Sequence, residues 1–174
     1  DHHSAFFSLL GIYSLILGIK TEKKIFWILL PIFFVFGFLS KQVPSSYIIL
    51  SAIIVLIIFS FLEKKYYWFK YSILSFIFLI IFLLIFGSFQ GISLSSFLNQ
   101  YFLYPQSIGS ERIEKFVFTF RGVVGHFKFI YIALIPLIFI NLKKIFFETG
   151  YLKNKNFYYF LILILSTFAL IFHQ

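Results

Sequence analysis

Long uncharged, apolar runs alternate with short clusters of charged residues along most of the chain. Most runs approach the about 20 residues that a helix needs to cross roughly 30 Å of hydrocarbon. The pattern predicts six membrane-spanning helices, at about residues 4–19, 25–40, 46–62, 71–88, 128–142 and 157–173. The fifth run is the weakest, because it spans a bilayer only if Lys128 and Lys143 extend their amines outward from its two ends.

The composition agrees with a chain that lies mostly in lipid. Of 174 residues, 61% are hydrophobic, 24% aromatic and 12% charged, and the mean hydropathy is +0.99. Soluble domains do not have this composition. We therefore expect an all-α, polytopic transmembrane helix bundle that forms a single domain over residues 1–174. The chain has no Cys, which excludes disulfides and thiolate metal sites.

One long connection, residues 89–127, interrupts the apolar runs. Within it, the apolar and polar residues of 92–104 separate onto opposite faces of a helix, as in an amphipathic helix, and Pro105 follows. We expect this short helix to lie along the membrane surface.

The lysines predict the orientation of the bundle. Ten of the fifteen basic residues fall in the connections after the first, third and fifth runs: Lys20, Lys23, Lys24, Lys64, Lys65, Lys70, Lys143, Lys144, Lys153 and Lys155. Cytoplasmic loops carry such an excess, so residue 1 and the 89–127 loop are expected on the extracytoplasmic face. The net charge of +9 is then mainly a topology signal, and no solvated basic surface for nucleic acid is present.

The chain opens on Asp1-His2-His3, which contains its only aspartate, and it has no initial methionine. We expect the sequence to begin inside a longer protein. A carboxylate beside imidazoles suits a divalent metal, a sugar or a phosphate, or it is simply a solvated helix start; adjacent residues rarely hold one ion together. Small residues continue the face of Asp1 along the first run, at Ser4, Ser8, Gly11 and Gly18. Such a stripe allows close helix packing, so this face should look into the bundle and Asp1 should border a cavity.

Other candidate residues lie on the same predicted face of the membrane. Lys41 is the sole basic residue of a short connection, and it fits either a phosphate contact or an anchor at the membrane surface. Both arginines of the chain, Arg112 and Arg121, lie in the long loop and match the geometry of phosphate. Alternatively, Arg112 pairs with a neighbouring glutamate and Arg121 meets lipid headgroups. His126 belongs either to the site or to the headgroup region.

Residues 1–7, the apolar span after them and the stretch Phe36-Gly37-Phe38-Leu39-Ser40-Lys41 resemble an internal portion of the GT-C glycosyltransferases. The similarity is greatest to the branch of the protein mannosyltransferases and the aminoarabinose transferase of lipid A, and it covers residues 1 to about 50. It implies an enzyme that moves a sugar from a polyprenyl-phosphate carrier to an acceptor on the extracytoplasmic face. The main catalytic carboxylate of the family lies upstream of the matched motif, which implies that this fragment alone is inactive.

The resemblance also implies roles for the candidate residues. Asp1 would be a secondary acid, a substrate contact or a metal ligand, while Lys41, Arg112 and Arg121 would hold the phosphate. His2, His3 and His126 would contact substrate. The expected partners are the lipid-linked sugar donor and membrane lipids, the expected location is a bacterial inner (plasma) membrane, and the need for a divalent metal stays open. Two alternatives are an O-antigen ligase or polymerase-like protein and a fragment of a transporter or channel.

Overall fold

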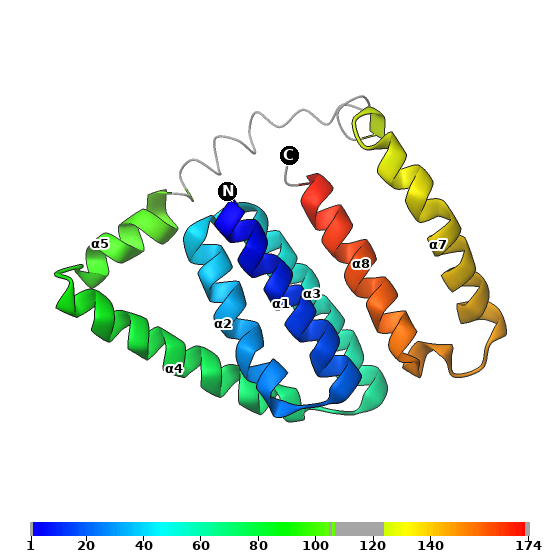
Figure 1. Ribbon diagram of the computed structural model, residues 1–174, viewed down its shortest axis with the longest axis horizontal. Coiled ribbons are helices and arrows are strands. Elements are labelled where there is room, and N and C mark those ends of the chain that lie inside the picture. Colours follow the sequence, from blue (N-terminus) through cyan, green and yellow to red (C-terminus); the bar gives the residue numbers. More distant parts are fainter. Residues whose placement is uncertain (1, 105, 107–123, 173–174) are drawn as a thin grey trace.

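The computed structural model describes residues 2–104, 106 and 124–172, and every regular element in these ranges is helical (Figure 1). The prediction of an all-α fold is confirmed. In chain order the elements are α1 (His2–Thr21), α2 (Lys24–Ser40), α3 (Gln42–Glu63), α4 (Tyr67–Phe89), α5 (Leu94–Leu98), η1 (Asn99–Leu103), α7 (Lys128–Phe147), η3 (Tyr151–Lys153) and α8 (Lys155–Phe172).

The first five predicted apolar runs fall within helices, and α8 covers the sixth up to residue 172, but the helices differ in length. Four of them, α1, α3, α4 and α7, are long and apolar enough to cross a membrane, which is compatible with an integral membrane protein. The other two, α2 and α8, are shorter apolar helices, so the count of six spans stays a prediction. The weakest predicted run is longer than expected, because α7 continues through Lys143 and Lys144 to Phe147. Lysines near a helix end can extend toward the headgroups.

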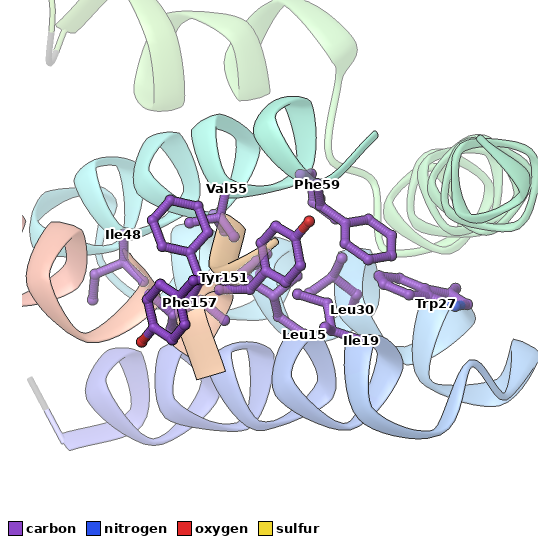
Figure 2. Packing of buried hydrophobic residues seen from close by; sticks show 14 residues of the cluster. Leu15, Ile19, Trp27, Leu30, Ile48, Val55, Phe59, Tyr151 and Phe157 are labelled. Carbon is purple, nitrogen blue, oxygen red and sulfur yellow. The ribbon is translucent and has the colours of Figure 1, made fainter. Parts of the chain in front are cut away.

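Close packing of α1 against α2 and α3 follows from the small residues of α1. Ser4, Ser8, Gly11 and Gly18 are all buried, which confirms the predicted inward face. Gly18 lies against the indole of Trp27, and that side chain is fully buried. Figure 2 shows Trp27 beside Phe59 at one end of the core cluster, with Leu15, Ile19 and Leu30 close by. The ring centroids of Trp27 and Phe59 are 6.4 Å apart.

The helices α4 and α7 flank this core on opposite sides (Figure 1). The helix α4 packs against α2 and then diverges from it, and Leu79 is its buried residue. The helix α7 packs against α8 and η3. Its buried Asn141 donates a hydrogen bond of 2.8 Å to the carbonyl of Leu137 and accepts one from the hydroxyl of Tyr151.

Three lysine-bearing connections meet at one end of the bundle. The Lys65 amine lies 2.7 Å from the Glu22 carboxylate, and the Lys155 amine donates a 2.8 Å hydrogen bond to the Lys20 carbonyl. We call this the lysine-rich end. At the other end, Ser4 of α1 bonds to the Lys41 carbonyl, and Gln42 bonds to the Tyr101 carbonyl of η1. We call this the Lys41 end. The structure therefore agrees with the predicted grouping of the connections, while their assignment to the cytoplasm stays a prediction.

The ion pair between Glu22 and Lys65 makes stability depend on pH. The hydrogen bond from Lys65 holds the pKa of the Glu22 carboxyl below its ordinary 4.5. The same bond raises the pKa of Lys65 above 10.5. The contribution of Glu22 is therefore present above pH 4.5 and is lost as the pH falls through the lowered value. The contribution of Lys65 to stability is present below pH 10.5 and is lost as the pH rises through the raised pKa.

Replacement of Glu22 by glutamine should lower the free energy of unfolding at neutral pH by less than about 1 kcal/mol, because both side chains are partly exposed. The difference from wild type should shrink in acid below pH 4.5. Unfolding in detergent at a series of pH values measures it, with Glu148→Gln at the same end as the control. An equal pH dependence in the two variants would contradict the assignment to the ion pair.

Candidate functional site

The structure describes four of the seven predicted site residues: His2, His3, Lys41 and His126, all with exposed side chains. The remaining three, Asp1, Arg112 and Arg121, lie outside the described residues. His2 and His3 form the first turn of α1, next to the connection that holds Lys41. His126 precedes α7, which stands on the far side of α8 (Figure 1). The fold thus brings His2, His3 and Lys41 to one end of the core that α1, α2 and α3 form, and it sets His126 apart from them.

The backbone of Lys41 is fixed between α2 and α3. Lys41 is extended, with φ −162° and ψ 122°, and its N–H donates to the carbonyl of Gly37. The Ser4 hydroxyl donates a 3.3 Å hydrogen bond to the Lys41 carbonyl. The Lys41 backbone is thus held by hydrogen bonds at both of its polar groups, and its side chain is exposed.

A buried group of serines lies directly beneath Lys41. The Ser45 hydroxyl is 2.7 Å from that of Ser4 and 3.0 Å from that of Ser8. Gly37 makes room for them, because a Cβ there would lie 3.2 Å from the Ser8 hydroxyl and 3.3 Å from that of Ser45. The hydroxyls satisfy one another in a buried site, so they act by joining α1 to α3 and positioning Lys41.

A large apolar groove runs between α2, α3 and α4, with a volume of about 940 Å³. Its walls come from residues 30–39 of α2, residues 49–56 of α3 and residues 68–88 of α4. Twenty residues of α4 at 1.5 Å each correspond to about 30 Å, the thickness of the hydrocarbon core. This groove is therefore long enough to hold an extended lipid tail.

The two ends of the groove differ in polarity. Trp68 and Ser72 line it toward the lysine-rich end, where both polar groups are bonded to the protein: the Trp68 indole N–H donates a 2.6 Å hydrogen bond to Ser60, and the Ser72 hydroxyl donates one of 2.9 Å to the Trp27 carbonyl. Ser88, Ser93 and Gln100 line it toward the Lys41 end. An amphiphile with a polar head at the Lys41 end and an apolar tail matches this distribution.

A roof of two short helices, α5 and η1, covers the groove at the Lys41 end. Ile92, Leu94, Phe97 and Tyr101 line the groove from above. They belong to the apolar side of the predicted amphipathic helix, which the structure divides into α5 and the π-helical η1. The Gln42 amide donates a 2.5 Å hydrogen bond to the Tyr101 carbonyl, so the roof is held beside Lys41. Its position on a membrane surface stays a prediction.

Sequence reasoning missed the contribution of Gln42 and Ser45. Both lie in the polar stretch after Lys41, Gln42-Val43-Pro44-Ser45-Ser46, and that stretch was the available signal. A metal at Asp1 stays an open prediction: among the described residues no three His, Asp or Glu side chains gather where they could hold an ion. Comparison with protein-family models, curated proteins and solved structures finds no match. The resemblance to GT-C glycosyltransferases therefore rests on the quoted residues alone.

Proposed function

We propose that the protein belongs to a membrane glycosyltransferase, which transfers a sugar from a polyprenyl-phosphate donor to an acceptor at the extracytoplasmic face. The observation that supports this best is the apolar groove, whose lining residue Tyr101 is bonded through its carbonyl to Gln42, the residue that follows Lys41. A polyprenyl phosphate has the matching chemistry, since its long tail needs an apolar channel and its phosphate needs a cation at the membrane surface. The resemblance supplies the sugar, which the groove does not specify.

In this proposal each part of the Lys41 end has a chemical task. The acceptor oxygen attacks the anomeric carbon, the bond from that carbon to the phosphate oxygen breaks, and a carboxylate takes the acceptor's proton. The Lys41 ammonium stabilises the negative charge that develops on the departing phosphate. His2 and His3 hydrogen-bond the sugar, and Asp1 acts as a secondary acid.

Replacement of Lys41 by alanine should lower the affinity for a long-chain polyprenyl phosphate about tenfold, as expected for loss of a hydrogen bond between charged groups. Affinity for the uncharged polyprenol should not change, and Lys41→Arg should keep most of the difference between the two lipids. Binding is measured with the protein in nanodiscs. Lys128→Ala is the matched control, because this lysine starts α7 on the other side of the bundle (Figure 1). An unchanged preference for the phosphate in Lys41→Ala would contradict the role of Lys41.

The transfer step needs its own measurement in native membranes that contain the protein. With a polyprenyl-phosphate-linked sugar as donor, Lys41→Ala and Asp1→Asn should each reduce sugar transfer sharply while membrane insertion stays at the wild-type level. Wild-type transfer in both variants would refute these two site assignments.

A further inference from the structure

We propose that residues 92–103 form a lid over the groove and that Gln42 is the latch that holds this lid closed. The inference rests on the proposed function in one respect, because the groove is the site that the lid would control. It adds a regulated step, the exchange of the lipid at the Lys41 end.

One side of the lid faces the groove. Ile92, Leu94 and Phe97 line the groove together with the polar Ser93 and Gln100. Ser95, Ser96 and Asn99 do not line it and are exposed, as is Leu98. The rings of Phe97 and Tyr101 stack with centroids 4.8 Å apart, which joins α5 to η1 on the side that faces the groove. The two short helices can therefore move together as one piece.

The connection between α4 and the lid has the features of a hinge. Gly91 adopts φ +74°, and a Cβ built there would meet nothing within 4 Å. The Ile92 N–H bonds to the Gly87 carbonyl over 2.9 Å, and the Gly91 N–H bonds to that of Ser88 over 3.0 Å. Ser93 then caps α5 by accepting a hydrogen bond from the Ser96 N–H. The bend is thus confined to a few residues between two regular helices, as in hinges that absorb a rotation.

The latch lies on the opposite side of the groove from the hinge. Gln42, at the start of α3, donates its 2.5 Å hydrogen bond to the Tyr101 carbonyl in η1. One such bond changes an equilibrium by a factor of about five, which suits a contact that must both form and break. Because Gln42 follows Lys41 directly, release of the latch would open the groove next to the proposed phosphate contact.

Spin labels can test the lid directly, because the chain has no Cys and engineered cysteines are therefore unique. One label replaces the exposed Leu98 of the lid and the other the exposed Tyr47 of α3. In nanodiscs, Gln42→Leu should increase the population at longer label separation about fivefold. Polyprenyl phosphate should restore the shorter separation in both proteins. A control pair at Tyr47 and the exposed Phe78 of α4 should not change.

Identical lid distances in wild type and Gln42→Leu, with and without polyprenyl phosphate, would overturn the proposal. Gly91→Ala is a second variant, because alanine at this φ is strained and should also shift the lid. Opening in Gln42→Leu without any lipid binding would support the lid and refute the proposed donor. Lipid binding with an immobile lid would refute the lid and leave the proposed function standing.

Discussion

Replacement of Ile53 by tryptophan should lower the affinity for polyprenyl phosphate at least tenfold, whereas the same change at Ile57 should leave it unaltered. The two isoleucines lie one turn apart on α3 and are 46% and 61% exposed, but only Ile53 is among the residues that line the groove. An indole at position 53 occupies space that the tail needs. Displacing about 100 Å² of apolar tail surface costs about 2.5 kcal/mol, which exceeds the 1.4 kcal/mol of a tenfold change.

Native mass spectrometry of the protein with added polyprenyl phosphate measures this difference. A second matched pair on α4 repeats the test from the other wall, since Leu84 lines the groove and its neighbour Ile85 is exposed outside it. Thermal unfolding of all four variants confirms that they are folded. Equal losses of binding within each pair would show that the tail does not lie in the groove.

Replacement of Gly18 by valine should destabilise the fold by about 3 kcal/mol, at the upper end of the usual range for overpacking a core. A Cβ at Gly18 would lie 2.9–3.0 Å from three atoms of the Trp27 ring. That ring is fully buried and has Phe59, Tyr67 and Trp68 around it, so it has little room to move. The close approach of α1 to α2 therefore requires glycine at this position.

Unfolding of the variant in detergent, compared with Gly87→Val, measures the effect. A Cβ at Gly87 meets only Ile92, at 4.0 Å, so the control carries the same change of helix propensity without the clash. The double variant with Trp27→Phe should recover part of the lost stability, because a smaller ring relieves the contact. Equal destabilisation by the two valines would contradict the packing argument.

The helices and the inward face of α1 were predictable from local pattern, whereas the groove was not. The runs predict α1 to α4 because long apolar segments can satisfy their backbone in lipid only as helices. Ser4 and Gly18 mark the packed face of α1, since small residues allow close approach. In contrast, α4 meets α2 through Ser72 and Ser75, whose hydroxyls donate hydrogen bonds to the carbonyls of Trp27 and Ile28. No local pattern indicates that the helix then diverges from α2.

The candidate site was predictable only where charge stands out against lipid. Lys41 drew attention as a basic residue in a short connection, and the structure places it next to Gln42, which bonds to the Tyr101 carbonyl; Tyr101 lines the groove. Gln42 was missed because its partner is a backbone carbonyl 59 positions away, and no local pattern reports such a contact. His126 was grouped with the site because it shares a predicted membrane face, but the packing of α7 against α8 separates it from Lys41.

Photo-crosslinking with a polyprenyl phosphate that carries diazirines along its tail tests the central claim most directly. After irradiation in nanodiscs, peptide mapping should find adducts on the groove-lining residues, such as Phe34 and Phe38 of α2, Ile49 and Ile53 of α3, and Ile73 and Leu84 of α4. An excess of unlabelled polyprenyl phosphate should suppress these adducts. Adducts spread equally over α7 and over Leu50 and Ile57 on the exposed side of α3, insensitive to that competitor, would contradict the account.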